Sequence, residues 1–493
     1  IITPNPTNVE SVLQNSSAIM DSVEFLVRNY NTIWIRDYAA NSVYKDFNDS
    51  LILVDWIYNR PRPLDNSSPS AAADQLGIPL YQMTTPPTDV IGTGGNFMSD
   101  GFGTAFSSKL ILDENGLGNG FGVTPKTEAD IDQIFSDFMG ISNYIKMENL
   151  PYDDIDHIDM HMKLLDEETL LVSEYPPGVA DGPQIEANIQ YVLNNHMSVF
   201  GTPFKLVRIV VPPSTSGLFP DNNGWYRTYT NSVFVNNTLI VPYYREEYDT
   251  IAERILKETL PGYKIVGVNV DTQSGEQLIA AGGAIHCITH SVGTQAPLII
   301  RHQPLEDTHD NINPYQVTAF ISHRSGIANA TLHYKLNEND PYLSLPMIHL
   351  GNDNWSALIP AQQQETEIFY YIEATANSGK KQNRPMPAPD GYWKFKVFGD
   401  GDLSTTEFSF NRKAPFPNPA SAITAIPFDG VLGEKGTIGL YDATGRMVQL
   451  IHEGDFKFGE QHFFFQAQDF AKGTYSVIIR TNERTEVHPI VIF

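Results

Sequence analysis

The chain of 493 residues has one cysteine, Cys287, so an intramolecular disulfide is impossible. It carries only 32 Lys and Arg against 58 Asp and Glu. The net charge of −26 argues against a nucleic acid or an anionic membrane as partner, and it favours a cationic substrate. The sequence lacks an apolar run of about 18 residues, so we expect no membrane-spanning segment. Its composition excludes disordered, collagen-like and coiled-coil classes, and no clear periodic repeat is visible.

At roughly 100–200 residues per domain, the length allows two to four domains. Residues 1–296 predict one α/β domain, because short apolar runs alternate with helical patterns. The predicted strands are Val23–Val27, Ile33–Ile35, Leu51–Trp56, Leu206–Val211, Ser232–Val241 and Ile265–Val270. The predicted helices are Glu128–Phe138, Pro183–Asn195 and Glu247–Glu258.

Helical periodicity stops after Pro297. Strand-like runs at sandwich-type spacing predict a β-sandwich over residues 297–400. Residues 401–414 are expected to be a linker that leads into the Pro-rich segment Ala414–Ala420. Residues 415–493 predict a small β-domain, in which Asp442–Gly445 marks a hairpin turn.

Two short motifs carry charges that suit a substrate. In Trp34-Ile-Arg-Asp37, the indole can lie along an aliphatic or cationic chain, and Asp37 can receive a cation. In Arg60-Pro-Arg62, two guanidinium groups around a rigid proline can fork onto a carboxylate. Each motif taken alone also fits a purely structural alternative. The first fits a core tryptophan with a surface ion pair, and the second fits a solvated loop.

The segment Asp156-His-Ile-Asp-Met-His161 places polar residues at alternate positions. If it is an extended strand, residues 157, 159 and 161 share one face. His157 is then a general acid or base, and Asp159 is its partner in binding a cation. A metal site made with His161 and a plain polar strand edge are the alternatives.

The run Gly282-Gly-Ala-Ile-His-Cys287 supplies a candidate nucleophile next to glycines that permit close backbone approach. An inert buried thiol is the alternative. His286 would face away from Cys287 in an extended segment, which favours His157 as the acid or base. Gly94-Gly-Asn96 suits a tight turn near a ligand, but it lacks the spacing of a phosphate-binding loop.

Together and in this order, the motifs at Trp34–Asp37, Gly94–Asn96, His157–Asp159, Tyr229–Asn231 and Gly282–Thr289 resemble the guanidino-group-modifying superfamily. The resemblance covers about residues 20–295 and is most specific at the cysteine. It implies a pentein, a five-bladed α/β propeller with the active site in its central channel. Only 33 residues precede Trp34, so we expect part of the first blade to be missing or supplied by a cleaved segment.

The resemblance further implies that Cys287 attacks a guanidinium held by Asp37 and Asp159, with His157 as general acid and base. No metal or cofactor is needed. Bacterial peptidylarginine deiminases of this branch act preferentially on C-terminal arginine. By resemblance, Arg60 and Arg62 bind the terminal carboxylate, Trp34 packs along the methylenes and Asn231 lines the site.

The accessory regions are similar to an immunoglobulin-like domain and, from residue 415, to the C-terminal sorting domain of the type IX secretion system of Bacteroidetes. Pro417–Ala420, Leu440–Arg446 and Lys472–Val477 carry the second likeness. It implies export to the cell surface, with the type IX machinery as partner. A small-molecule deiminase acting on agmatine or free arginine, and a non-enzymatic surface binding protein, are the competing hypotheses.

Overall fold

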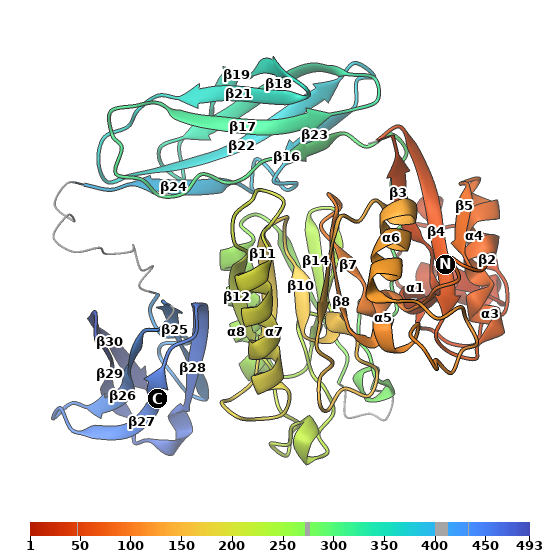
Figure 1. The fold of residues 1–493 in the computed structure, drawn as a ribbon. Coiled ribbons are helices and arrows are strands. Elements are labelled where there is room, and N and C mark those ends of the chain that lie inside the picture. The colour runs from red at the N-terminus through yellow and green to blue at the C-terminus, as the bar shows by residue number, and fades with distance from the viewer. Residues whose placement is uncertain (47, 272–276, 400–412, 432) are drawn as a thin grey trace.

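The computed structural model describes residues 1–46, 48–271, 277–399, 413–431 and 433–493. Figure 1 shows an α/β region with a layered set of strands above it and a smaller group of strands at its side, next to β12 and α8. The predicted linker 401–414 lies outside the described residues except for its last two positions.

Four units within the described part of the α/β region repeat one pattern. Each unit has an antiparallel hairpin, a crossover helix and a strand parallel to the second hairpin strand. The units are β3 (Asn41–Lys45), β4 (Ser50–Tyr58), α4 (Ser68–Leu76) and β5 (Leu80–Met83); β7 (Met98–Ser99), β8 (Thr104–Ser108), α6 (Glu128–Met139) and β9 (Asn143–Met147); β10 (Met162–Leu164), β11 (Thr169–Glu174), α7 (Gly182–Asn195) and β12 (Lys205–Val210); and β13 (Val233–Val235), β14 (Thr238–Tyr243), α8 (Glu246–Thr259) and β15 (Lys264–Asn269).

At the N-terminus, β1 (Ile2–Thr3) pairs in parallel with β2 (Leu26–Val27) across α1 (Pro6–Asn15). The repeat is invisible as a sequence period because it lies in the order and pairing of the strands, while the connections differ in length. Closure of the units into a five-bladed propeller stays a prediction.

The crossover helices show why the sequence pattern succeeds. Helix α6 begins with a capping box, in which the Thr127 side chain accepts from the backbone of Asp130 and the Asp130 side chain accepts from the backbone of Thr127. It ends at Gly140, whose φ of 70° is left-handed. Its buried face carries Ile131 and Phe135. The three predicted helices are confirmed within one residue at each end.

Two strand predictions are wrong. The predicted strand Ser232–Val241 is a hairpin of β13 and β14, and its turn contains Asn236 with a φ of 53°. The predicted strand Ile33–Ile35 is absent from the described residues, because Ile35 begins the one-turn helix α2 (Ile35–Tyr38). The predicted strand at Val23–Val27 shortens to β2.

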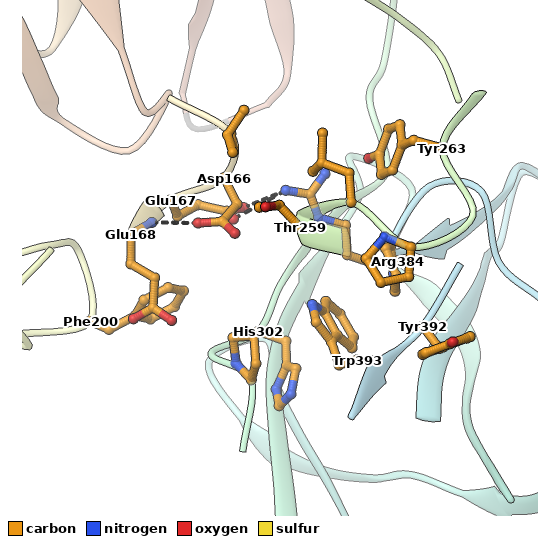
Figure 2. A pocket seen from close by; sticks show the side chains of 15 residues that line it. Asp166, Glu167, Glu168, Phe200, Thr259, Tyr263, His302, Arg384, Tyr392 and Trp393 are labelled. Carbon is orange, nitrogen blue, oxygen red and sulfur yellow. Dashed lines mark hydrogen bonds and ion pairs between the residues drawn. The ribbon is translucent and has the colours of Figure 1, made fainter. Parts of the chain in front are cut away.

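Residues from Ile299 to Val397 form two antiparallel sheets that share one apolar core. One sheet has β16 (Ile299–Arg301), β17 (Tyr315–Ser322), β21 (Asn354–Ile359) and β20 (Ile348–Gly351), and the other has β19 (Leu343–Pro346), β18 (Ile327–Lys335), β22 (Thr366–Ala376), β23 (Lys381–Arg384) and β24 (Trp393–Val397). Where this sandwich meets the α/β region, a cavity of about 100 Å³ is bordered by the ion pair of Arg384 Nη2 and Glu167 Oε1 at 2.9 Å (Figure 2).

The C-terminal residues form a second, smaller strand domain around its own apolar core. Its strands are β25 (Ile423–Gly430), β26 (Lys435–Asp442), β27 (Met447–Asp455), β28 (Gly459–Gln466), β29 (Gly473–Thr481) and β30 (Thr485–Ile492). The predicted turn at Asp442–Gly445 joins β26 to β27.

This domain is joined to the α/β region by strand pairing and by apolar packing. Strand β28 runs parallel to β12, with Val207 opposite Glu460. Phe416, from the segment before β25, is buried in the same core as Ile251 and Ile255 of α8. The pairing covers the edge of β12, which would otherwise be a free strand edge.

Candidate active site

Helix α2 positions Asp37 beside the segment that carries the cysteine. The backbone N–H of Arg36 donates to the carbonyl of Cys287 at 3.1 Å, and Arg36 Nε donates to the carbonyl of His286 at 3.4 Å. These bonds join segments 250 residues apart, and they leave the Asp37 side chain buried. Asp37 Oδ1 lies 3.7 Å from His157 Nδ1, so the two predicted site residues are neighbours.

His157 and Asp159 lie on a 3-10 turn and not on the predicted strand. Asp156 has a left-handed φ of 54°, which takes the chain out of the extended conformation. The turn η3 (Ile158–Met160) follows directly. The expectation that residues 157, 159 and 161 share a strand face is therefore wrong. His157 and Asp159 are nevertheless both buried, with His157 Nε2 3.2 Å from Thr93 Oγ1.

The two glycine motifs are explained by close packing. A Cβ on Gly95 would lie 2.3 Å from His157 Nδ1. A Cβ on Gly283 would lie 2.7 Å from the indole of Trp34 and 3.0 Å from Cys287 Sγ. Both contacts are shorter than a carbon atom permits, so a side chain at either position would displace the residues beside the thiol.

Asn231 and His286 hold the nucleophile segment. Asn231 Nδ2 donates to Cys287 Sγ at 3.1 Å, and Asn231 Oδ1 accepts the backbone N–H of His286 at 3.0 Å. His286 Nδ1 lies 2.7 Å from Asp159 Oδ2, which in turn lies 3.8 Å from Cys287 Sγ. The expectation that His286 faces away is wrong, because Ile285–Ile288 forms turns instead of a strand.

The electrostatics describe a site in which burial and the two carboxylates outweigh the nearby positive charges. Burial raises the pKa of the Cys287 thiol well above its ordinary value, and the charges of Asp159 and Asp37 raise it further. Burial, with Asp37 nearby, raises the pKa of Asp159 to about 8, although Arg36 and Lys163 act to lower it. Burial also lowers the pKa of His157. A cation placed between the carboxylates would favour both the thiolate and the carboxylate forms.

Two side-chain oxygens at the site could accept hydrogen bonds from such a cation. Within the residues that the structure describes, Asp37 Oδ1 and Asp159 Oδ1 are buried and accept no hydrogen bond. Buried acceptors are normally satisfied, and exceptions concentrate at functional sites. The two carboxylates come from different chain segments, Asp37 on α2 and Asp159 on η3, and both act electrostatically on Cys287.

Arg60 and Arg62 follow the end of β4. Arg60 Nη1 donates to the carbonyl of Asn59 at 3.1 Å, and Arg62 Nη1 donates to Tyr58 Oη at 2.8 Å. In the described ranges of the chain neither guanidinium has a carboxylate within ion-pair distance. The positive charge of Arg60 contributes to the lowered pKa of His157, which puts Arg60 in electrostatic reach of the site.

A metal centre is not formed by these side chains. Among the described residues, no group of three or more His, Cys, Asp and Glu side chains is arranged to hold an ion. His161 is buried with both ring nitrogens lacking a hydrogen-bond partner in the described structure, and burial lowers its pKa to about 4.

Sequence reasoning missed several side chains of this cluster. Thr93 precedes the Gly94 motif. Arg36 lies inside the Trp34 motif, where the local pattern indicates only a surface ion pair. Arg36 is instead largely buried behind the site, and burial lowers its pKa. Lys163 lies beside the ring of Phe234 at 5.7 Å, and burial lowers its pKa to about 7. Their neighbouring motifs were the available signal.

Comparisons with known proteins identify the family of the chain. The chain belongs to the Porphyromonas-type peptidyl-arginine deiminase family, whose model matches residues 2–292. The α/β region is thus that of a guanidino-group deiminase of the pentein superfamily. A second model, the secretion system C-terminal sorting domain, matches residues 414–493. This type IX sorting domain indicates secretion and attachment to the cell surface, and it implies the secretion machinery as partner.

Several proteins similar to this chain are named agmatine deiminases. The agmatine deiminase of Pseudomonas syringae pv. tomato is 24% identical over 294 residues, which cover 55% of this chain and 77% of that protein. The solved agmatine deiminase of C. jejuni is 25% identical with a TM-score of 0.45, covering 58% of this chain and 78% of that one. That of Enterococcus faecalis is 19% identical with a TM-score of 0.47, covering 57% and 81%. No helix in the described residues is long and apolar enough to cross a membrane.

Proposed function

We propose that this protein hydrolyses the guanidinium of peptide arginine, preferentially C-terminal arginine, to citrulline and ammonia. The observation that carries the proposal is the pair of buried acceptors without hydrogen bonds, Asp37 Oδ1 and Asp159 Oδ1, on two carboxylates whose charges both act on Cys287. A guanidinium presents N–H donors in a planar fork, and two carboxylates can hold it by charge-assisted bonds.

In the proposed reaction the bound cation first lowers the pKa of the Cys287 thiol, which is raised in the empty site. The thiolate attacks the guanidinium carbon and forms a C–S bond. His157 takes the proton of the thiol and passes it to the departing nitrogen, so the C–N bond breaks and ammonia leaves. His157 then takes a proton from water, which attacks the thiouronium carbon. The C–S bond breaks, citrulline leaves, and His157 returns its proton to the sulfur, which restores the thiol.

The preference for a C-terminal arginine rests on Arg60 and Arg62. Their guanidinium groups lack a carboxylate partner in the described part of the chain, and Arg60 is in electrostatic reach of His157. They would attract the carboxylate of a C-terminal arginine and repel the amine of agmatine. Trp34, which lies against Gly283 beside the thiol, suits the methylenes of the substrate. Asn231 acts on Cys287 through its 3.1 Å hydrogen bond to Sγ.

The deciding experiment measures ammonia release from a peptide ending in arginine, its C-terminal amide and agmatine, because deimination of agmatine gives a carbamoylated amine and not citrulline. We expect kcat/KM to be highest for the free carboxylate, and the Arg62→Ala variant to lose about 10- to 100-fold on that peptide while changing little on the amide. Lys45→Ala, which alters an exposed cation at the end of β3, serves as the control. Equal rates on peptide and amide would remove the carboxylate clamp but keep the deiminase.

A second candidate function is the deimination of agmatine or free arginine, since the similar proteins named above are agmatine deiminases. Activity confined to agmatine in the same assay would establish it in place of the peptide reaction. No detectable deimination of any of the three substrates would overturn both candidate functions.

We also propose that residues 1–296 close into the five-bladed pentein propeller, followed by an immunoglobulin-like domain over 297–400 and the sorting domain over 415–493. The four repeated units among the described residues support the closure. Limited proteolysis followed by fragment masses checks the boundaries, and early cuts inside 297–400 would argue against the middle domain.

A further inference from the structure

The contact between His286 and Asp159 is held firmly from several sides. His286 Nδ1 lies 2.7 Å from Asp159 Oδ2, and the two side chains are only 15% and 3% exposed. The backbone N–H of His286 donates to Asn231 Oδ1 at 3.0 Å and to the Asn231 carbonyl at 3.2 Å. The carbonyl of Asp159 accepts from Thr230 Oγ1 at 3.1 Å. Both backbones are thus fixed, so the relative placement of ring and carboxylate is built into the fold.

The protonation state of the pair follows from its surroundings. Burial lowers the pKa of His286 well below its ordinary value, and the nearby positive charges of Arg36 and Lys163 lower it further. The imidazole is therefore neutral at pH 7, and when a bound cation ionises Asp159 the ring donates to it through the Nδ1–H tautomer, which that hydrogen bond selects. The ring is a donor here and not a counter-ion.

The hydrogen bond from His286 gives the two carboxylate oxygens of Asp159 different roles. Oδ2 is engaged by His286, whereas Oδ1 is the buried acceptor without a hydrogen bond in the described structure. The same Oδ2 also accepts a long hydrogen bond from the Cys287 thiol, whose Sγ is 3.8 Å away, and this donor would remain without the ring. A carboxylate released from His286 is thus free to rotate about χ2 and turn its oxygens toward the thiol.

We propose that His286 is a positioning residue, which fixes the Asp159 carboxylate through Nδ1–H so that the free Oδ1 meets the substrate guanidinium. This inference rests on the proposed function and names a side chain that this function does not use. His286 itself exchanges no proton with the substrate. It acts through Asp159, and it keeps the carboxylate from turning toward the thiol.

The charges around Asp159 determine what removal of His286 does. Asp159 faces Asp37 and Arg36 from α2, Lys163 from β10, Asp153 from the preceding loop, and Cys287. Asp37 and Asp153 favour its protonated form, while Arg36 and Lys163 favour the carboxylate. The N–H donor of His286 adds to the second group, so removing it leaves the carboxylate less favoured.

The test uses matched variants of the whole chain. His286→Leu removes the donor and keeps the bulk, whereas His286→Asn places an amide N–H near the former Nδ1 position. His290→Gln, in the same segment, is the control, because His290 Nε2 contacts the Ala40 carbonyl at 2.9 Å and not Asp159. Thermal unfolding of each variant shows whether it folds.

For His286→Leu we expect kcat/KM on an arginine-ending peptide to fall about 10- to 100-fold, with the acidic limb of its pH profile moved to higher pH. His286→Asn should recover most of this loss, and His290→Gln should match the wild type. Wild-type kcat/KM and pH limb in His286→Leu would overturn the inference, as would equal losses in the leucine and asparagine variants.

A binding measurement separates this inference from the proposed function. The affinity of the same peptide is measured calorimetrically in the Cys287→Ala background, with and without His286→Leu. A weakening of about 10-fold or more on adding His286→Leu supports the positioning role without turnover. Unchanged affinity overturns it. A wild-type enzyme that neither binds the peptide nor releases citrulline overturns the proposed function and the inference with it.

Discussion

Buried carboxylates occur both at Cys287 and where β12 meets β28, yet only the second group is fully matched by cations. At that junction Lys457 Nζ lies 3.4 Å from Glu174 Oε1 and 3.2 Å from Glu186 Oε1. Glu186 also pairs with Arg208, whose side chain is completely buried. Glu174 Oε2 accepts the backbone N–H of His462 at 3.1 Å.

The site at Cys287 is arranged differently. Asp37 and Asp159 each keep an oxygen without a hydrogen bond among the described residues, and the pKa of Asp159 is raised to about 8. Leaving a buried acceptor unmatched costs about 1–3 kcal/mol of stability. The charges at the junction therefore stabilise the fold. The cysteine site instead retains carboxylate oxygens without hydrogen bonds, to which a cationic substrate can donate.

The largest expected effect comes from Cys287→Ala. Without the thiol no covalent intermediate forms, so citrulline release should fall by about 10⁴-fold or more. The thermal midpoint should stay within a few degrees of the wild type, because the change removes one buried sulfur atom. Retention of more than a hundredth of the activity would show that Cys287 is not the nucleophile.

Asp159→Asn sharpens the comparison because activity and stability should move in opposite directions. We expect kcat/KM to fall about 100-fold, since a charge-assisted bond to the guanidinium is lost. The free energy of unfolding should rise, because folded Asp159 must hold a proton that the unfolded chain releases, whereas an amide has no such proton to take up. A variant that is less stable than the wild type at pH 8 would break the comparison.

The sign of the pH dependence follows from the raised pKa. Folded Asp159 holds its proton up to about pH 8, while the unfolded chain releases it near 3.8. The folded state therefore binds more protons in this window, and this group makes stability fall as pH rises from about 4 to 8. The stability advantage of Asp159→Asn should grow over that window in urea titrations, and a constant difference would contradict the assignment.

Lys457→Glu removes a cation from the junction of β12 and β28. It should lower stability and leave kcat/KM unchanged. It places a third carboxylate beside Glu174 and Glu186, but the Lys457 side chain is 31% exposed, so solvent reduces the penalty to about 1–2 kcal/mol. Urea unfolding and proteolytic release of residues 413–493 measure the loss. Lys435→Glu, at a pair with Asp455 whose side chains are 71% and 66% exposed, is the control.

The smallest effect is expected for Thr93→Val. The hydroxyl of Thr93 lies 3.2 Å from His157 Nε2 and helps to orient the ring. Removing one neutral hydrogen bond of this kind should lower kcat by about 3- to 10-fold. A steady-state assay checks this, and a loss as large as that of Asp159→Asn would show that Thr93 does more than orient His157.

Local sequence patterns predicted the three long crossover helices and the residue types of the site. Helices α6, α7 and α8 follow from apolar spacing and end signals that lie within the segments themselves. The residue types of the site followed from short motifs around Cys287, His157 and Asp37. Their roles in catalysis stay predictions until the variants above are measured.

The sequence by itself indicated the candidate nucleophile, the imidazole and the two carboxylates, since these stand in recognisable local patterns. Only the tertiary structure decided how they meet. The left-handed Asp156 and the turns around Cys287 redirect side chains that an extended chain would separate, which brings His286 onto Asp159 across 127 residues. Side-chain direction depends on backbone dihedrals and on partners distant in the chain, and short patterns do not encode either.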